Sequence, residues 1–481
     1  MHCVATPTIA YDSRRGRLVL ASAITASGIA FLDGTVVNVA LPRIGADLGG
    51  GFATLQWVVD AYMLTLGSLV LVGGALGDML GRRRVFHAGI VGFGIASVGC
   101  ALAPTAAVLI GARAVQGVAA ALLVPGSLSL LSSLFEGADR GRAIGAWSGL
   151  TGVFTALGPF VGGFLVQSWE HGWRLVFLIN VPLVVVAVVL CLIAIPDLPG
   201  NRGSARLDLA GATLVTLGLG LVVYPLIEWP RLSHTVAVSL LVAGGVALGA
   251  FLVVESRAAM PMLPLGLFRI RTFSVANAIT FVVYAALGAT IFLLVVTLQE
   301  ALGYSAVASG AVGLPVTVAL LLFSSRVGGM VPKVGARVLL TVGCLLTAWG
   351  LLLLGRIEPD SSFLWGVLPG VLVFAAGLVF VVAPVTTTVL GDVGTEHSGV
   401  ASGTNNAVAR VGSLIAVALL PLTSGLASVS RDDPHAITAG FHSAMVATAA
   451  LCVLGGLLAL LGLPGPNLAS PASDPHGAMD P

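Results

Sequence analysis

Fourteen apolar stretches, each about as long as the roughly 20 residues that cross a bilayer as a helix, dominate this sequence. They lie at about 17–41, 55–76, 85–103, 106–134, 143–166, 174–195, 208–228, 235–255, 274–298, 305–325, 337–355, 363–390, 398–422 and 438–463. Only 9% of the 481 residues are charged, whereas soluble domains carry about 25%. This composition excludes a water-soluble globule, and the sequence predicts an all-α membrane protein with 14 spans.

The basic residues predict the orientation of these spans. An even number of spans places both termini on one side of the membrane. Of the 23 lysines and arginines, two lie inside spans and five in loops on the opposite side, which leaves sixteen on the side of the termini. The five are Arg43, Arg174, Arg231, Arg356 and Arg431. Cytoplasmic loops carry the excess of Lys and Arg, so both termini are predicted to be cytoplasmic. The net charge of +2 does not favour a nucleic-acid partner.

A weak internal repeat predicts how the spans are grouped. Four positions recur 254 residues later, three of them with the same residue type: Gly74 and Gly328, Asp78 and Pro332, Gly81 and Gly335, Arg83 and Arg337. Together with the span count, this predicts two six-helix bundles with a helix pair inserted between them, an arrangement common in transporters.

The predicted segments follow from this grouping. They are a cytoplasmic tail at 1–16, a first bundle at 17–195, connectors with two extra spans at 196–273, a second bundle at 274–463 and a disordered tail at 464–481. If the two extra spans, 208–228 and 235–255, are an accessory pair, a chain lacking them should keep some transport; a chain that inserts correctly but is inert would show that the pair is part of the transport machinery.

Four ionisable residues lie well inside spans: Asp33, Asp60, Arg113 and Arg410. Such residues are costly in a bilayer and are candidates for function. The first three lie about 8–12 Å below the outer face at 1.5 Å per residue, so they can share one layer of the bundle. Burial favours the neutral form of a carboxylic acid and a nearby arginine favours its charged form. We therefore expect a proton site, with a structural ion pair as the alternative; Asp60, nearer the interface, is alternatively exposed to water.

Other polar residues follow a helical spacing. Arg113, Gln116 and Gly117 lie on one helix face, and Asn406 and Arg410, with Asn405 adjacent, lie on another. Contact with a substrate and hydrogen bonding between helices remain equal alternatives for the second group.

Two glycine-rich patterns carry further predictions. The segment GALGDMLGRRR at 74–84 combines a tight turn with an acid that can cap a helix and three arginines that fix orientation. The segment GPFVGG at 158–163 removes side chains at one-turn spacing around a proline. It is either a pivot between the two halves or a site of plain close packing.

With these segments, the chain resembles the fourteen-spanner drug:proton antiporter family of the major facilitator superfamily. The matching motifs are LDGTVVNVALP at 32–42, WVVDAY at 57–62, GALGDMLGRRR at 74–84, RAVQG at 113–117, GPFVGG at 158–163, and WR at 173–174 with FLINVP at 177–182. The resemblance covers nearly the whole chain and implies the major facilitator fold.

The resemblance also implies roles for individual residues. Proton coupling is assigned to Asp33 and Arg113, with Asp60 as a further candidate where many relatives have a neutral residue. The gate loop is Gly74, Asp78, Gly81, Arg82, Arg83 and Arg84, and the antiporter motif is Gly158, Pro159, Gly162 and Gly163. Pro332 departs from the acidic residue of the first loop. The candidate substrate-cavity residues are Asp33, Asn38, Asp60, Tyr62, Gln116, Asn405, Asn406 and Arg410.

The function expected is proton-driven export of amphipathic or cationic small molecules across a bacterial inner membrane, by a monomer. The chain contains no GxxxxGK[ST] motif for ATP and no metal-ligand spacing, so no cofactor is expected beyond the proton gradient. Export of a native metabolite, such as a self-made antibiotic, lipid or siderophore, is the alternative. A lipid-modifying enzyme is a remote one, because the eight histidines are dispersed and no HExxH cluster occurs.

Overall fold

The computed structural model describes residues 9–197, 200, 208–258, 261–391, 393, 398–430 and 433–465. Within them, 14 helical spans are long and apolar enough to cross a membrane, which confirms the predicted all-α fold and the span count. Most of residues 196–207, the first of the predicted connectors, and nearly all of the predicted tail at 464–481 lie outside the described residues.

The first six spans are α1 (Arg14–Leu48), α2 (Phe52–Leu80), α3 (Arg82–Ala101), α4 (Ala106–Leu134), α5 (Gly137–Ser168) and the pair α6 (Trp173–Leu178) and α7 (Asn180–Ala194). Spans seven and eight are α8 (Leu209–Glu228) and α9 (His234–Arg257). The last six are α10 (Arg271–Glu300), the pair α11 (Ala306–Ala311) and α12 (Leu314–Gly328), α14 (Ala336–Leu354), α15 (Leu368–Gly391), α16 (Ser398–Thr423) and α17 (Pro434–Gly462). Short elements are α13 (Val331–Val334), η1 (Trp229–Arg231), η2 (Leu265–Arg269), η3 (Phe363–Val367) and η5 (Leu426–Ser428).

Several helices extend beyond the apolar stretches that predict them. Helix α1 continues through Pro42 to Leu48, where Gly49 ends it with a φ of 73°. Hydrophobicity marks only the part of a helix that lies in hydrocarbon, whereas the helix itself continues until its backbone is capped. Spans six and ten are each broken into two helices, and Pro182 and Pro315 lie in the first turn of the second helix, where a proline is tolerated.

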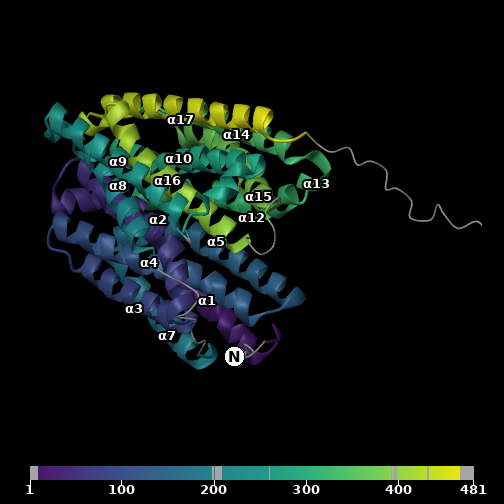
Figure 1. The fold of residues 1–481 in the computed structure, drawn as a ribbon. Coiled ribbons are helices and arrows are strands. Elements are labelled where there is room, and N and C mark those ends of the chain that lie inside the picture. The colour runs from purple at the N-terminus through teal and green to yellow at the C-terminus, as the bar shows by residue number, and fades with distance from the viewer. Residues whose placement is uncertain are drawn as a thin grey trace, which may run out of the picture.

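The spans are grouped in two layers (Figure 1). The first six lie in the lower layer of this view and the last six, including α14 and α17, in the upper layer. One hydrophobic core belongs to the first half, and a larger one runs through both halves, with Val58 of α2 and Phe292 of α10 among its buried members. The layers are therefore packed together rather than merely tethered.

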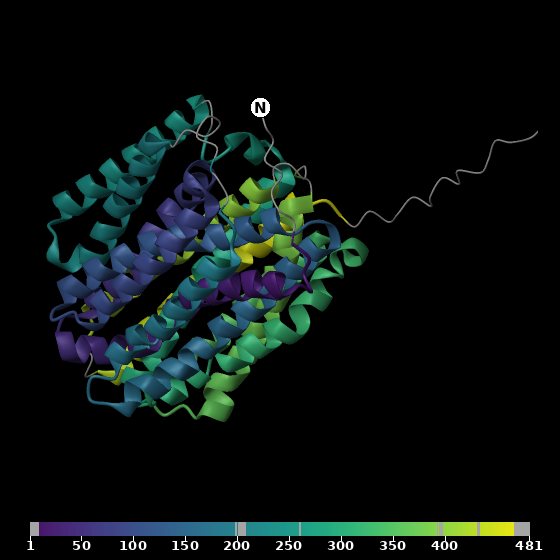
Figure 2. The same ribbon diagram turned by 90° about the horizontal axis from the view of Figure 1, so that it is seen from below.

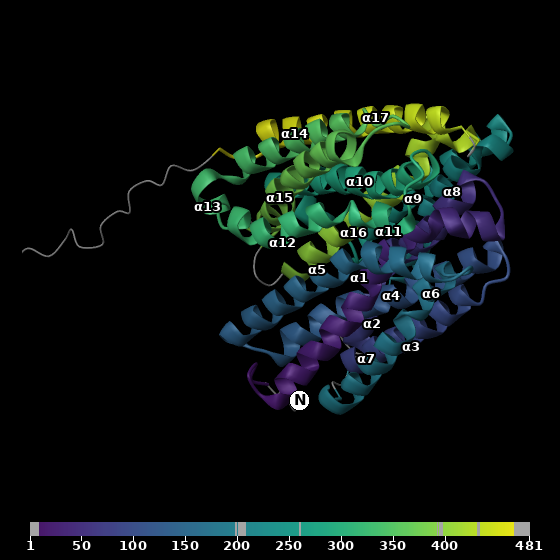
Figure 3. The same cartoon turned by 180° about the vertical axis from the view of Figure 1, so that it is seen from behind.

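The two halves meet at the end of the molecule that carries the α1–α2 connection. There Gln56 Nε2 donates hydrogen bonds to the carbonyl oxygens of Val417 (2.8 Å) and Ala418 (3.1 Å), and Gln299 Nε2 donates to Val39 O (3.1 Å). Toward the opposite end, which carries α13 and the α2–α3 turn, the layers diverge (Figures 1 and 3). The structure is thus closed at one end and spread at the other.

The turns at the two repeated glycines adopt the same backbone conformation. Gly81, between α2 and α3, has φ 103° and ψ 124°, and Gly335, between α13 and α14, has φ 87° and ψ 143°. A residue with a Cβ atom rarely adopts this positive φ, which explains why glycine stands at both positions. The repeat read from the sequence therefore extends to the local backbone.

The inserted pair α8 and α9 lies at one side of the molecule (Figure 2). Helix α8 packs against both α2 and α16, one helix from each half, and α9 packs against α8. Leu219 and Val223 of α8 form a small core with Leu414 of α16, against which Trp57 of α2 packs. Trp57 Nε1 also donates a hydrogen bond to Glu228 Oε1 at the end of α8 (2.9 Å). Helix α8 therefore covers the seam between the halves.

Candidate functional site: a buried carboxylate–arginine network

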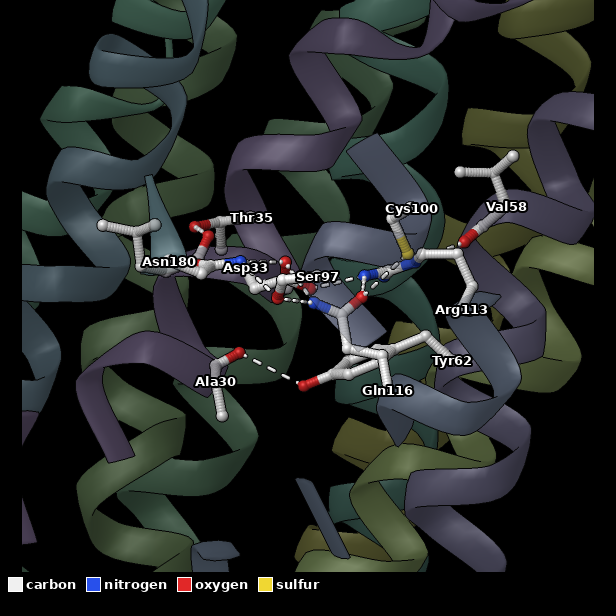
Figure 4. Close-up of polar contacts among 12 residues, drawn as sticks. Ala30, Asp33, Thr35, Val58, Tyr62, Ser97, Cys100, Arg113, Gln116 and Asn180 are labelled. Atoms are coloured by element: carbon white, nitrogen blue, oxygen red, sulfur yellow. Dashed lines mark hydrogen bonds and ion pairs between the residues drawn. The ribbon is translucent and has the colours of Figure 1, made fainter. Parts of the chain in front are cut away.

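The centre of the first half holds a buried ion pair between α1 and α4 (Figure 4). Arg113 Nη1 lies 2.5 Å from Asp33 Oδ2, and neither side chain is more than 2% exposed. Apolar side chains surround both residues on their own helices, so helix packing alone carries them into the interior. A pair at this depth is retained only when each charge is compensated.

Three further polar side chains complete the network around this pair. Asp33 Oδ1 accepts hydrogen bonds from Asn180 Nδ2 of α7 (2.9 Å) and from Gln116 Nε2 (3.0 Å). Ser97 Oγ of α3 accepts hydrogen bonds from Gln116 Nε2 (2.9 Å) and Asn180 Nδ2 (3.3 Å). All these residues are fully buried. Four helices of the first half thus meet in one network, and α4 and α7 bond directly to the carboxylate on α1.

The guanidinium of Arg113 is held on its other sides as well. Its Nε donates to Val58 O of α2 (2.9 Å), and Nη1 donates to Gln116 Oε1 (2.7 Å). The Arg113 Cζ atom lies 4.3 Å from the ring centre of Tyr62 and 5.8 Å from that of Phe177. Cation–π contacts of this kind are strongest when both groups are removed from water. The side chain therefore has one well-defined position.

This geometry matches the hydrogen-bonding capacity of a carboxylate at Asp33. A carboxylate accepts hydrogen bonds at both oxygens, whereas a protonated acid has one donor to place and weaker acceptors. A neutral group in place of the Asp33 carboxylate would leave the buried guanidinium of Arg113 without its counter-charge.

The structure does not join Asp60 to this network. Asp60 is fully buried on α2, and neither of its carboxylate oxygens has a hydrogen-bond partner in the described part of the chain. The alternative that Asp60 is exposed to water is wrong for this conformation. Its position and its missing partners set it apart from Asp33.

The remaining cavity candidates lie in separate places. Asn38 is buried and donates to Gly34 O of its own helix (3.2 Å). Asn405 Nδ2 donates to Asn277 Oδ1 (3.1 Å) and Thr280 Oγ1 (2.8 Å) of α10, as the helix-bonding alternative predicts. Asn406 is exposed. The guanidinium of the half-buried Arg410 lies 5.8 Å from the ring centre of Phe31, across the boundary between α16 and α1. These residues do not form one cavity here.

The gate loop is mostly helical. Gly74 lies on α2, and Gly81 is the one residue between α2 and α3. Asp78 does not cap α3 but pairs with Arg82 at 3.0 Å, across the turn at Gly81. Arg83 and Arg84 bond to Leu192 O and to Asp197, each at 3.2 Å. Every partner described for these side chains belongs to the first half or its connector. In this conformation the loop does not latch the halves together.

The antiporter motif packs on two sides of α5. A Cβ atom on Gly158 would lie 2.1 Å from Thr35 Oγ1, and one on Gly162 would lie 2.6 Å from Val36 Cγ2, both on α1. A Cβ atom on Gly163 would lie 2.6 Å from Ala306 O of α11. On the same side, a Cβ atom on Gly310 of α11 would lie 2.2 Å from Pro159 O. Helix α5 thus contacts its own half through Gly158 and Gly162, and it contacts the other half through Gly163 and Pro159.

A methyl group at Gly163 should weaken the closed end. In Gly163→Ala, overlap with the backbone of α11 disfavours contact between α5 and α11 by about 1–3 kcal/mol, the usual cost of overpacking. We expect a transport rate reduced roughly fivefold or more, measured in vesicles at equal protein content. Gly152→Ala is the matched control, because nothing lies within 4 Å of that Cβ position on the same helix. Equal rates for the two variants would contradict a role for this contact.

Sequence reasoning named Asp33, Arg113, Gln116 and Tyr62 but assigned no role to Ser97 or Asn180. Both are buried and bond within the network, and Asn180 reaches Asp33 across 147 positions of the chain. A polar residue within an apolar span was a usable signal at Asn180. Ser97 gave none, since serine is common in membrane helices and often bonds to its own backbone.

Comparison with known proteins agrees with this architecture. The sequence profile of the Major Facilitator Superfamily matches residues 23–417. The D-xylose-proton symporter has a TM-score of 0.67 at 16% identity, covering 93% of this chain and 98% of that one. A bacterial homologue of the human lysosomal transporter Spinster, inward-facing and unoccupied, has a TM-score of 0.67 at 18% identity over 94% and 97%.

Closer sequence relatives are resistance and export proteins. The chain is 36% identical over 408 residues to the multidrug resistance protein Stp of Mycobacterium tuberculosis (84% of this chain, 75% of the relative). It is 35% identical to the puromycin resistance protein pur8 of Streptomyces alboniger (86% and 82%) and to the cephamycin export protein CmcT of Amycolatopsis lactamdurans (89% and 89%). With its 14 spans and these relatives, the chain belongs to the major facilitator superfamily of membrane transporters.

Proposed function

We propose that this protein is a proton-coupled exporter of amphipathic or cationic small molecules in a bacterial inner membrane, with both termini in the cytoplasm. The observation that carries the proposal is the buried pair of Asp33 and Arg113, at a depth where an ionisable residue is retained for function. The relatives named for multidrug and puromycin resistance support a drug-like substrate.

Asp33 is the proton carrier in this scheme. In the state described above it is ionised, held by Arg113, Gln116 and Asn180. Protonation from the outside breaks the ion pair and releases α4 from α1, and deprotonation toward the cytoplasm restores it. Substrate export is linked to this cycle because each protonation state of Asp33 favours a different arrangement of the two halves.

The arrangement of the halves supports alternating access. The end that carries the α1–α2 connection is closed by Gln56 and Gln299, and this end is extracellular in the proposed orientation. At the cytoplasmic end, every described partner of the gate loop belongs to its own half or connector, as expected when that end is free to open.

A transport assay in reconstituted vesicles tests the proposal. The full chain is incorporated into proteoliposomes, and uptake is measured for a panel of organic cations, neutral amphipathic drugs and antibiotics, with and without a pH gradient. We expect that at least one class of compound is taken up only with the gradient. Its uptake into the vesicles should acidify the external solution, because the protons move in the opposite direction. Uptake that is equal with the gradient present or collapsed would refute proton coupling.

Export of a native metabolite is the second candidate. It is favoured by relatives named as a probable actinorhodin transporter of Streptomyces coelicolor and as a tetracenomycin C resistance and export protein of Streptomyces glaucescens. The same vesicle panel separates the two candidates, since a native exporter takes one compound class and rejects unrelated drugs, whereas a multidrug exporter takes several.

A further inference from the structure

We infer that Asp60 is a proton-dependent lock on the contact between α2 and α16, so that the two halves close at this end only when its carboxylic acid is neutral. This assigns Asp60 a task separate from that of Asp33. It rests on the proposed function only for naming the closed end extracellular.

The lock follows first from the burial of Asp60. The residue is 0% exposed, and both carboxylate oxygens lack a hydrogen-bond partner among the residues that the structure describes. An ionised carboxylate in such a place loses its hydration with nothing in exchange, which costs several kcal/mol. A neutral carboxylic acid loses far less. The closed arrangement therefore selects the protonated side chain.

The position of Asp60 on α2 places it at the boundary between the halves. Gln56, one turn earlier, bonds to the carbonyl groups of Val417 and Ala418 of α16. Gly67, two turns later, faces Arg410 of α16, whose Cβ lies 3.2 Å from the position of an added Cβ. Residues spaced in this way share one face of a helix. Asp60 thus lies on the face of α2 that is covered when the halves close.

Helix α8 encloses the same position from the side. Trp57 and Leu64 of α2, which precede and follow Asp60 by about one turn, both pack against the apolar core shared by α8 and α16. In this core, Leu219, Val223 and Leu414 are at most 3% exposed. The inserted helix therefore supplies an apolar wall around an acid, which explains why the neutral form is required.

No charge on a neighbouring element compensates Asp60. Inside the spans packed against α2, the charged groups are Asp33 of α1, Arg113 of α4 and Arg410 of α16. At the ends of these spans they are Arg43 and Asp47 of α1, which bind each other, Glu228 of α8 and, at the far end of α2, Arg14, Arg15 and Arg17 of α1 and Arg82, Arg83 and Arg84 of α3 with His87. The guanidinium of Arg410 lies over the ring of Phe31 and forms no ion pair with any described residue. Asp33 and Arg113 bind each other, and Glu228 binds Trp57 and Arg231. The face of α2 that contacts Gly117 of α4, at Tyr62 and Thr65, is roughly 140–160° around the helix from Asp60.

The closed structure thus contains two buried acids in opposite surroundings. Asp33 is bonded at both carboxylate oxygens, whereas neither carboxylate oxygen of Asp60 has a hydrogen-bond partner among the described residues. When α2 and α16 separate, Asp60 meets water on the extracellular side and ionises. Because the closed state binds one more proton than the open state at this site, acid favours closure and rising pH favours opening, by up to about tenfold per pH unit.

Distance measurement between spin labels tests this lock. Labels are placed on Ala46→Cys of α1 and Thr423→Cys of α16, two exposed positions at the closed end of opposite halves, in the full chain with its native cysteines replaced. In nanodiscs, we expect the population with the short distance to fall as pH rises from about 5 to about 9, because the closed state binds one more proton than the open state. In Asp60→Asn the short distance should persist over the whole range, because an amide stays neutral.

Two further variants keep the test decisive. Asp60→Leu removes the polar group and should also remain closed at all pH values, whereas Asp60→Glu should restore a pH response. An unchanged pH response in Asp60→Asn, or opening of Asp60→Leu at every pH, would overturn the inference. The measurement uses no substrate and no gradient, so a failure of coupled transport in vesicles leaves its result intact, and the reverse also holds.

Discussion

In the Asp33→Asn variant, gradient-driven transport falls to the level of vesicles without protein, while the chain still inserts and folds. The amide takes the place of the carboxylate at Gln116 and Asn180 but cannot exchange a proton. It also removes the counter-charge of Arg113, which lies 2.5 Å away and almost fully buried. Uptake by proteoliposomes with an imposed pH gradient measures the effect.

Stability needs its own control in this experiment, because an unpaired buried charge costs about 3–5 kcal/mol. The double variant Asp33→Asn with Arg113→Gln removes both charges together. We expect it to recover the thermal stability lost by the single variant and to remain inactive in coupled transport. Full antiport by either variant would take Asp33 out of the mechanism.

A chain without the inserted helix pair, in which residue 195 is joined to residue 274 through a linker, is expected to lose transport. The contacts of α8 lead us to expect this loss. If the pair were only accessory, as considered from the sequence, some transport would remain. Helix α8 covers the seam between α2 and α16, and its removal breaks the bond from Trp57 to Glu228. A hydrogen bond to a charged group contributes about 1.5–3 kcal/mol, which is about tenfold to a hundredfold in the population of the closed state.

The control for this deletion lies on α9, which contacts α8 but neither α2 nor α16 closely. Val242 and Val246 are 61% and 68% exposed there, so Val242→Ala with Val246→Ala should transport at the wild-type rate. Trp57→Phe keeps an aromatic ring but removes the N–H group that bonds to Glu228, and we expect an intermediate loss of transport. A correctly inserted deletion variant with wild-type transport would show that α8 does not act on the seam.

Membrane insertion explains why the sequence predicts so much of the fold. A helix satisfies its own backbone in hydrocarbon, so every span is visible as an apolar stretch. All fourteen stretches correspond to helical spans, and the glycines repeated at 81 and 335 share one backbone conformation. The domain boundaries and the orientation of the termini stay predictions. Helix ends beyond the hydrocarbon were missed, as at Leu48 of α1, because capping rather than hydrophobicity sets them.

The candidate site divides in the same way. The sequence identified Asp33 and Arg113 because charged residues stand out in apolar helices, and their spacing with Gln116 put one face of α4 toward the interior. The sequence analysis grouped Asp60 with them because a sequence indicates only how deep along its span a residue lies. The direction in which a side chain points relative to other helices is a property of packing, and packing put Asp60 on a different face of α2.

The sequence by itself determined that this chain is a bundle of fourteen membrane helices with charged residues inside its spans, since the residue type largely sets the cost of placing a side chain in hydrocarbon. The tertiary structure decided which partners compensate each charge. It joined Asn180 to Asp33 and Ser97 to Gln116 and Asn180, left Asp60 without a hydrogen-bond partner among the described residues and placed α8 over the seam. These contacts join residues far apart in the chain, and only the packing of whole helices fixes them.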